Sequence, residues 1–509
     1  MPNWESLFRL IYFVIHGRIK EVMEVMGMLK SISLENYKCF KNKTDIDIAP
    51  LTVLCGVNSS GKSSILKSLL MLKQSYEDNN ASNNLIFNGK YVDNGSFNEI
   101  LSYNSSNKYF HISNSFDIAG KGISKDSTNF KDLYRLYYNK KIKLFKIINS
   151  IDVIESTGFV NANKIAKYDI SIIIIQNNGT SISSHISMVS TGQNTYNISC
   201  KQIPDTSGNL DDFEIRTCTC HFSGMVLNSI YKEKMNDQQK LFIPAIVSIF
   251  NIIYSQYMQI RYIAPLRESP KRRYITDKSV SSVGVFGENA AILLKNKFCK
   301  KWDGITAPVS ENNVNNLLYG FNSYKFHDIF KSWLRYFELG NIWLDKSQQE
   351  IIKIKINNSN VIDVGFGVSQ VLPILVEGIY MPPEQTLLLE QPEIHLHPKM
   401  QMKIADFLLS LAMQNKQIIV ETHSDHFINR LVRRCMEDRK FHEKVQIFFI
   451  DKDENNVSHK QPITIDDVNG ALCENENFFY QFANETAKII DIGYRNLQNK
   501  KAVEGENNV

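Results

Sequence analysis

The chain has no long hydrophobic run and no paired cysteines. No stretch reaches the roughly 18 to 20 continuous apolar residues that cross a bilayer, and the short apolar segment 7–15 is not followed by the small-residue cleavage site of a signal peptide. The eight cysteines are scattered along the chain, which excludes a disulfide framework. We therefore expect a soluble, cytoplasmic protein without a membrane partner.

The chain also lacks a strong excess of charge. The formal net charge is +5 in 509 residues, and 43% of the residues are hydrophobic, which is ordinary for a globular protein and excludes wholesale disorder. DNA is thus a possible partner that the composition does not require. The candidate contacts to a phosphate backbone are two basic clusters, Arg267 with Lys271, Arg272 and Arg273, and Arg430 with Arg433 and Arg434. Runs of this kind more often form salt bridges or solvated faces.

No sustained heptad repeat is present, so a long coiled-coil arm is not expected. Residues 384–450 alternate between strand and helix patterns, which predicts a parallel sheet in an α/β fold. Residues 110–225 are rich in Ile, Ser, Asn and Thr and favour strands, and a helical pattern follows over about 225–260. The predicted order is an N-terminal extension (1–27), an N-terminal lobe (28–110), a β-rich then helical insertion (111–260), a C-terminal lobe (261–490) and a polar tail (491–509).

The strongest motif is a glycine-rich loop between a predicted strand and a predicted helix. The strand is 51–55, the helix is 63–73, and the loop Gly56-Val-Asn-Ser-Ser-Gly-Lys62-Ser63 matches the P-loop pattern without a gap. Its glycines allow backbone N–H groups to converge on phosphates at the start of a helix. We expect Lys62 to contact the β- and γ-phosphates and Ser63 to bind Mg²⁺.

Two further strands end in polar residues suited to the same site. The buried-strand run 386–390 ends at Glu390, the candidate Mg²⁺ carboxylate, and Gln391, Pro392 and Glu393 follow. The run 417–420 leads to His423, which at a strand end can hydrogen-bond a γ-phosphate. An ordinary strand-end residue is the alternative for His423.

A second glycine turn, Gly365-Phe-Gly367-Val-Ser369-Gln370, opens the predicted helix 371–377. A second anion-binding helix start in one nucleotide-binding protein is explained if this turn caps ATP held by another subunit. A plain helix N-terminus is the alternative.

The order of these motifs, with Glu-Gln-Pro-Glu-Ile-His-Leu-His-Pro at 390–398 and Glu-Thr-His-Ser at 421–424, resembles AAA family ATPases with an ABC/SMC-type head. These include the OLD and DUF3696-containing proteins. The resemblance implies an α/β P-loop NTPase head with a β-rich insertion and no long coiled coil. It also implies that Ser63 and Glu390 bind Mg²⁺ and that His423 is the switch histidine. The implied ATP ligands are Gly56, Asn58, Ser59, Gly61, Lys62, Ser63 and Ser64, with Gly367, Ser369 and Gln370 acting on a second subunit's nucleotide.

One position departs from this family pattern. The acidic pair usual at this strand end reads Glu390-Gln391, so an amide holds the position expected for the base that orients the attacking water. Glutamine positions a water but takes no proton at neutral pH. Either Glu393 or Glu390 supplies the carboxylate, or hydrolysis is slow and ATP acts chiefly as a dimerising ligand.

Three groups of acidic, histidine or cysteine residues are weaker candidates for a metal or nuclease site. Asp451 and Asp453 follow a predicted strand, 445–450, and resemble the paired acids of an OLD-type Toprim nuclease. Zinc sites are conceivable at two places, for which loops beside a nucleotide and ordinary strand residues are simpler explanations. The residues are His395, His397, His423 and His426, and Cys200, Cys218, Cys220 and His221.

The predicted function is that of an ATP-binding, ATP-hydrolysing enzyme that forms a homodimer or a higher even-numbered oligomer. ATPases of this compact type resemble subunits of bacterial anti-phage defence systems such as Septu, which implies a sensor or regulator that controls an HNH-type partner nuclease. The alternatives are a DNA-repair or SMC-like ATPase that acts on DNA directly, an OLD-type nuclease, and a switch that binds ATP without hydrolysing it.

Overall fold

The structure is a computed structural model of the whole chain. It describes residues 27–78, 84–103, 105–118, 142–156, 163–176, 181–192, 194–203, 213–275, 279–345, 351–357, 359–363, 367–468 and 470–472, and the single residues 488, 490, 492 and 494. The predicted N-terminal extension, apart from Gly27, and the predicted tail, apart from two residues, lie outside the described residues.

A seven-stranded sheet carries the glycine-rich loop. Its strand order is β11-β18-β19-β3-β20-β21-β22, and the first five strands are parallel. The strands are β11 (Ile260–Ile263), β18 (Thr386–Glu390), β19 (Gln417–Glu421), β3 (Leu51–Gly56), β20 (Val445–Lys452), β21 (Ser458–Asp466) and β22 (Gly470–Leu472). Every residue of β3, β18 and β19 is buried, as expected for parallel strands covered on both faces.

The parallel arrangement brings several motif ends to one edge of this sheet. Strand β3 ends at Gly56 and is followed by helix α3 (Lys62–Glu77), which confirms the predicted order of strand, loop and helix. In the adjoining strands Glu390 pairs in register with Glu421, and Glu421 with Leu54. Two carboxylates and the glycine-rich loop therefore share one edge.

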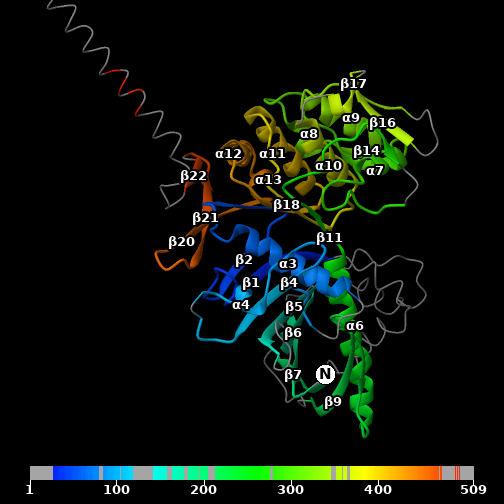
Figure 1. Cartoon of the computed structure of the whole chain (residues 1–509), viewed down its shortest axis with the longest axis vertical. Helices are drawn as coiled ribbons and strands as arrows, with labels where there is room; N and C mark the ends of the chain where they lie inside the picture. Colours follow the sequence, from blue (N-terminus) through cyan, green and yellow to red (C-terminus); the bar gives the residue numbers. More distant parts are fainter. Residues whose placement is uncertain are drawn as a thin grey trace, which may run out of the picture.

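A nine-stranded antiparallel sheet lies against the other side of α3 (Figure 1). Its order is β10-β9-β8-β7-β6-β5-β4-β1-β2, so the strands of the predicted β-rich segment extend the sheet that β1 and β2 begin. The strands are β1 (Gly27–Glu35), β2 (Thr44–Asp47), β4 (Tyr109–Ile118), β5 (Ile142–Glu155), β6 (Asn163–Gln176), β7 (Ser181–Ser190), β8 (Thr195–Ile203), β9 (Phe213–Ser223) and β10 (Val226–Tyr231).

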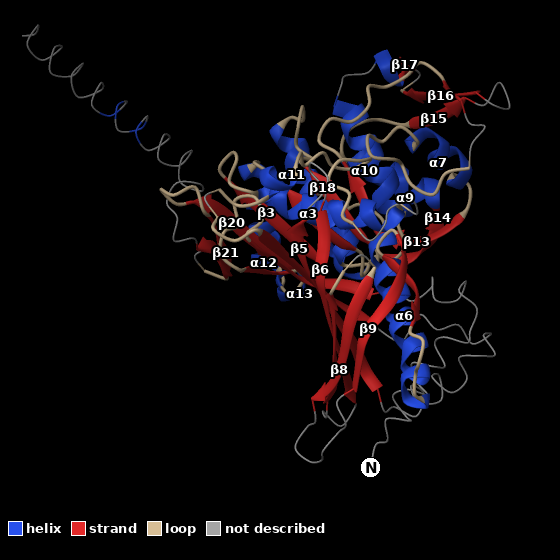
Figure 2. Ribbon diagram, turned by 60° about the horizontal axis from the view of Figure 1, so that its bottom comes forward, coloured by secondary structure: helices blue, strands red, loops and turns tan. Residues whose placement is uncertain are grey.

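Helix α6 (Asp237–Met258) runs along the long strands of this sheet (Figure 2). The helical segment was expected to begin near residue 225, and this boundary is wrong, because β10 occupies Val226–Tyr231. Asn236 caps the helix by accepting a hydrogen bond from the backbone N–H of Gln239 at 2.7 Å, which places the start of the helix at Asp237.

The remaining elements cover the opposite face of the seven-stranded sheet, at the top of Figure 1. The helices are α7 (Ala290–Lys297), α8 (Asn315–Tyr319), α9 (Phe326–Tyr336), α10 (Gly367–Tyr380), α11 (Pro398–Ala412), α12 (Asp425–Glu437) and α13 (Arg439–His442), with the 3₁₀ turn η2 (Val361–Asp363). Helix α4 (Phe97–Ile100) instead packs in the core on the side of the nine-stranded sheet. The strands are β12 (Tyr274–Ile275), β13 (Lys301–Ile305), β14 (Phe321–Lys325), β15 (Ile342–Asp345), β16 (Ile351–Ile356) and β17 (Ser359–Asn360).

Alternate residues of the central strands supply two hydrophobic cores. Leu54, Leu388 and Ile419 pack with α3 and the nine-stranded sheet. Val53 and Leu389 pack on the opposite face, with α10 and α11. The seven-stranded sheet is thus the middle layer of the molecule, and its strands β3, β18 and β19 are buried throughout.

A buried ion cluster joins helices α11 and α12. Arg430 and Arg434 donate to the Asp406 carboxylate at 2.7 Å each, and Tyr336 Oη donates to the same group at 2.6 Å. Asp406 and Arg434 are 0% exposed. The hypothesis that Arg430 and Arg434 contact a nucleic-acid backbone is therefore wrong, because their guanidinium groups serve internal pairing.

We predict that Asp406→Ala lowers the free energy of unfolding by about 3–5 kcal/mol, since it leaves two buried guanidinium groups without their counter-ion. Urea unfolding followed by circular dichroism measures the change. Arg439→Ala, which alters an exposed side chain on α13, is the control and should stay within about 0.5 kcal/mol of the wild type. Equal unfolding midpoints for the two variants would contradict the prediction.

Candidate functional site

Two glycines shape the loop after β3. Gly56 has φ 135°, and a Cβ there would lie 2.0 Å from the carbonyl oxygen of Ile450. Gly61 has φ 106°, and its Cβ would lie 2.3 Å from Cys39 Sγ. Both positions combine a backbone conformation that disfavours side chains with a lack of space, so the loop requires glycine at each.

Lys62, the first residue of α3, turns back onto this loop. Its Nζ donates to the carbonyl oxygens of Gly56 at 3.1 Å and Val57 at 2.6 Å, which uses two of the three ammonium donors. Burial lowers the pKa of Lys62, and the neighbouring Glu421 opposes this shift. The first turn of α3 contains no acidic residue, so its N-terminus is suited to an anion.

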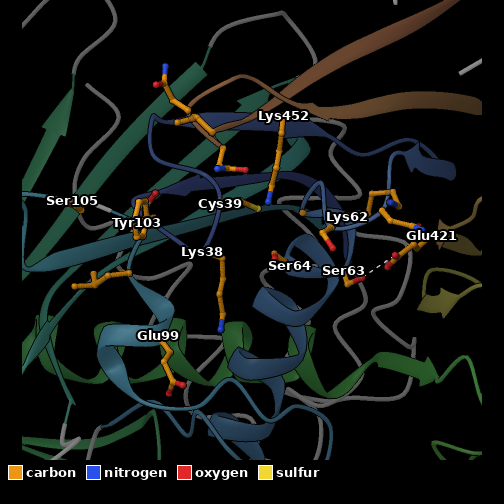
Figure 3. A pocket seen from close by; sticks show the side chains of 18 of the residues that line it. Lys38, Cys39, Lys62, Ser63, Ser64, Glu99, Tyr103, Ser105, Glu421 and Lys452 are labelled. Carbon is orange, nitrogen blue, oxygen red and sulfur yellow. Dashed lines mark hydrogen bonds between the residues drawn. The ribbon is translucent and has the colours of Figure 1, made fainter. Parts of the chain in front are cut away.

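The loop opens into a pocket of about 910 Å³ (Figure 3), within the range of small-molecule sites. The loop and the start of α3 contribute Asn58, Ser59, Gly61, Lys62, Ser63 and Ser64. The strand ends contribute Gln391, Glu421 and His423. The opposite rim is formed by residues from the loops after β1 and around α4 and from the β20–β21 hairpin, including Lys38, Cys39, Glu99, Tyr103 and Lys452.

Glu421 is the carboxylate that contacts the loop. Ser63 Oγ donates to Glu421 Oε1 at 2.8 Å, the contact drawn in Figure 3. Glu421 is 4% exposed, and its Oε2 has no hydrogen-bond partner among the described residues. Burial raises the pKa of this carboxyl. Glu421 was not among the residues predicted to bind Mg²⁺, although it ends a buried strand just as Glu390 does.

Glu390 lies one strand further from the loop. Its Oε1 accepts a hydrogen bond from Tyr262 Oη at 2.9 Å. Burial and the nearby charge of Glu421 raise its pKa. Glu390 is not among the described residues that line the pocket, so its role as the Mg²⁺ ligand stays a prediction.

Glu393 and His423 are joined through the backbone. Glu393 Oε1 accepts a hydrogen bond from the His423 backbone N–H at 2.7 Å, which holds the loop after β19 in place. The His423 side chain lines the pocket, and burial together with the charge of Lys62 lowers its pKa. A hydrogen bond with the Gly56 backbone opposes this shift. The lowered pKa favours the neutral imidazole, whose single N–H has to turn from Gly56 to reach a phosphate oxygen.

Arg267 fixes the backbone at the end of β18. Its guanidinium donates to the carbonyl oxygens of Glu390 at 2.9 Å and Gln391 at 3.3 Å. Gln391 has φ 42°, and its N–H donates to the Glu421 carbonyl oxygen at 2.7 Å. Burial lowers the pKa of Arg267 to about 10, so it remains charged at neutral pH.

The position of Arg267 contradicts its predicted contact with a nucleic-acid backbone. Arg267 is 4% exposed and is unable to contact a nucleic-acid backbone. Lys271 and Arg272 form ion pairs with Glu268 at 2.5 Å and Asp363 at 3.0 Å. Lys271, Arg272 and Arg273 are all exposed, and Arg273 differs from the other two because it has no ion pair among the described contacts.

The second glycine turn lies apart from the pocket. Gly367 begins α10, whereas Gly365 lies outside the described residues. Of the described residues that line the pocket, none belongs to α10. Ser369 is 5% exposed and packs beside Glu268–Pro270, and Gln370 is also buried. The structure therefore leaves the contact of Ser369 with a second molecule a prediction.

The acids proposed for a nuclease are occupied elsewhere. Asp453 Oδ1 accepts the backbone N–H groups of Asn455 and Val457, each at 2.9 Å, and Oδ2 contacts His459 at 3.1 Å, so Asp453 shapes the β20–β21 turn. Within the described part of the chain, no three His, Cys, Asp or Glu side chains are grouped to hold a metal ion. Neither the histidines at 395–426 nor the cysteine cluster forms such a group, and His221 faces solvent.

A P-loop at the carboxyl edge of a parallel sheet, with a strand-end carboxylate on its serine and a neutral histidine in the same pocket, defines a P-loop NTPase. The AAA ATPase domain model matches residues 28–428. The chain belongs to this family and is an ATPase of the AAA type, with an α/β head and no long coiled coil among its described residues. No curated protein sequence matches it.

Solved structures that resemble this chain include heads of SMC proteins. They are an SMC head bound to the C-winged helix domain of ScpA, the SMC head domain from Thermotoga maritima, and an SMC head with an extended coiled coil bound to the C-terminal domain of ScpA derived from Pyrococcus furiosus. Each is 11% identical, and each alignment covers 86% of this chain and 98%, 100% and 97%, respectively, of the other. The TM-scores are 0.33, 0.32 and 0.33, respectively. No helix among the described residues is long and apolar enough to span a membrane.

We predict that Tyr262→Phe lowers kcat for ATP hydrolysis about tenfold or more, because the hydrogen bond that orients Glu390 is lost, and bonds to charged groups contribute about 1.5–3 kcal/mol. A steady-state phosphate-release assay measures kcat. Tyr319→Phe, at an exposed tyrosine on α8, is the matched control. An unchanged kcat for Tyr262→Phe would show that this contact does not support the reaction.

Proposed function

We propose that the protein binds and slowly hydrolyses ATP with Mg²⁺ in the pocket around Lys62, and that it works as a dimer that encloses two ATP molecules. The observation that carries this proposal is the convergence of Lys62, Ser63, Gln391, Glu421 and His423 in one pocket. These side chains come from three separate strand ends, and each has a chemical role toward a triphosphate.

Each of these residues has a different contact with the triphosphate or its Mg²⁺ in this proposal. The loop N–H groups and the start of α3 bind the phosphates, and the Lys62 ammonium neutralises the β- and γ-oxygens. His423 turns its single N–H from the Gly56 backbone to a γ-phosphate oxygen. Ser63 and a strand-end carboxylate would hold the Mg²⁺ ion, which would neutralise charge on the transferring phosphoryl group. These residues fit a Mg²⁺–nucleotide site because oxygen ligands from one or two acids suffice when phosphates complete the coordination.

Gln391 makes hydrolysis slow in this proposal. Gln391 lines the pocket and holds the sequence position expected for the base that orients the attacking water, and an amide accepts no proton from a water at neutral pH. Glu390 and Glu393, the two carboxylates considered as substitutes, are hydrogen-bonded to Tyr262 and to the His423 backbone instead. ATP therefore serves first as a ligand that holds two subunits together.

The dimer accounts for the second glycine turn. Because α10 does not reach the pocket of its own chain, the N–H groups at Gly367, Ser369 and Gln370 act on ATP held by a second copy. A homodimer, or a higher even-numbered oligomer, completes each site with one helix start from the neighbouring subunit.

At the cellular level we propose a cytoplasmic sensor or regulator of a bacterial anti-phage defence system that controls an HNH-type partner nuclease. The resemblance of the motif order to that of such ATPases supports this role. A second candidate is a DNA-repair ATPase of the SMC-like type, for which DNA-stimulated hydrolysis by the isolated protein is the distinguishing result. The OLD-type nuclease is less favoured because Asp453 is engaged in a turn.

We expect Lys62→Ala to weaken ATP binding at least tenfold, because a charge-assisted contact to the phosphates contributes about 1.5–3 kcal/mol. Isothermal titration with ATP and Mg²⁺ measures Kd, and Lys234→Ala, at an exposed lysine remote from the pocket, is the control. If the wild type shows no heat of ATP binding, or if Lys62→Ala binds ATP as tightly as the control, the nucleotide site is misassigned.

We expect the wild type to dimerise when ATP and Mg²⁺ are added, and Gly367→Asp to bind ATP yet stay monomeric. An aspartate at a helix start is compatible with α10, and its Cβ would meet Leu396 at 3.4 Å and the His395 carbonyl oxygen at 3.8 Å, but its charge repels a partner's γ-phosphate. Gly367→Asn has nearly the same size without the charge and should still dimerise. Light scattering coupled to size-exclusion chromatography measures the masses, and a Gly367→Asp dimer would contradict the arrangement.

A further inference from the structure

Glu390 and Glu421 are the two candidate carboxylate ligands for Mg²⁺ in the proposed nucleotide site. Glu390 and Glu421 end neighbouring parallel strands and pair in register. Strand β19 lies between β18 and β3, so Glu421 is one strand from the P-loop strand and Glu390 is two strands away. The family pattern points to Glu390, whereas the geometry distinguishes the two.

Glu421 alone of this pair contacts the P-loop serine. Ser63 Oγ donates its hydrogen to Glu421 Oε1 at 2.8 Å, which leaves the lone pairs of the hydroxyl oxygen for a cation. The second oxygen, Oε2, is buried, lies on a side chain that lines the pocket, and has no hydrogen-bond partner among the described residues. Burying a carboxylate oxygen without a hydrogen-bond donor raises the free energy of the folded protein, and a cation bound to that oxygen lowers it again.

The other acids near the pocket have different partners. Glu390 Oε1 accepts a hydrogen bond from Tyr262, and Glu393 Oε1 accepts one from the His423 backbone. Glu393 Oε2 is also buried without a hydrogen-bond partner among the described residues. Neither Glu390 nor Glu393 belongs to the described lining of the pocket. Glu99 does line it, but on the exposed rim, where it accepts the Ser96 backbone N–H at 2.5 Å and caps α4. Glu421 is therefore the pocket acid that is both buried and beside Ser63.

We propose that Glu421, together with Ser63, binds the Mg²⁺ of the bound nucleotide directly, and that Glu390 acts behind it as a positioning residue. This inference rests on the proposed nucleotide site and moves the main metal contact from β18 to β19. It also explains why β18 ends in a glutamate tied to Tyr262: the Tyr262 hydrogen bond keeps Glu390 next to Glu421 without directing it into the pocket.

Binding of Mn²⁺ in the presence of ADP tests the proposal without any need for catalysis. Electron paramagnetic resonance of free Mn²⁺ gives the metal Kd for the wild type, Glu421→Gln, Glu390→Gln and the exposed control Glu233→Gln. We expect Glu421→Gln to weaken Mn²⁺ binding at least about tenfold, the scale on which metal-site ligands and their supports act. Glu390→Gln should produce a smaller loss, and Glu233→Gln no change.

A metal-free control separates this inference from the proposed function. In EDTA, Glu421→Gln should bind ADP as tightly as the wild type, which also shows that the variant is folded. If the wild type fails to bind ADP at all, the proposed function is wrong. If the wild type binds ADP and Mn²⁺ but Glu390→Gln loses more metal affinity than Glu421→Gln, only the assignment of Glu421 is overturned.

A double-mutant cycle adds a second readout. If Ser63 and Glu421 hold the same ion, Ser63→Ala combined with Glu421→Gln should weaken Mn²⁺ binding by less than the product of the two single effects. Strictly multiplicative losses would show that the two residues act on the metal independently and would overturn the proposal.

Discussion

The parallel pairing of β3 with β19 and β20 is the constraint on which the site depends. This pairing sets Glu421 opposite Leu54 and Ile450 opposite Gly56, so the end of each strand is positioned against the start of the P-loop. The contact is close enough that Gly56 has no room for a Cβ beside the Ile450 carbonyl oxygen. A shift of one residue in either register would bury the loop glycine against a side chain and turn Glu421 away from Ser63, because successive residues of a strand face opposite sides.

Charge compensation is the second organising feature. Three buried carboxylates, Glu390, Glu393 and Glu421, lie near two buried cations, Lys62 and Arg267, and burial raises the pKa of each of these acids. Most of these groups have a hydrogen-bond partner, which lowers the free-energy cost of burying their charges. Several of the partners are backbone groups. The arrangement explains why segment 262–267 is essential to the site although neither of its polar residues lines the pocket.

Much of the site was predictable because its motifs are local. The P-loop and the strand that ends at Glu390 follow from short patterns of burial and turn residues. The strand predicted at 417–420 and the helix predicted at 371–377 are also present, although the strand extends to Glu421 and the helix begins at Gly367. The basic clusters were misjudged for the opposite reason. Arg267, Arg430 and Arg434 are near other cations in the sequence, but their partners are Asp406 and the Glu390–Gln391 backbone, which lie far away along the chain. Linear charge density therefore gave no information about their burial.

The sequence by itself determined the class of the protein and its phosphate-binding loop, since glycine spacing and strand-end polarity are properties of neighbouring residues. It also determined that Gln391 departs from the acidic pattern. Only the tertiary structure decided which acid contacts Ser63, that Tyr262 and Arg267 hold the end of β18, and that α10 lies outside its own chain's pocket. Those facts depend on strand order and on the side chains that meet between distant segments, and no local pattern specifies which strands become neighbours.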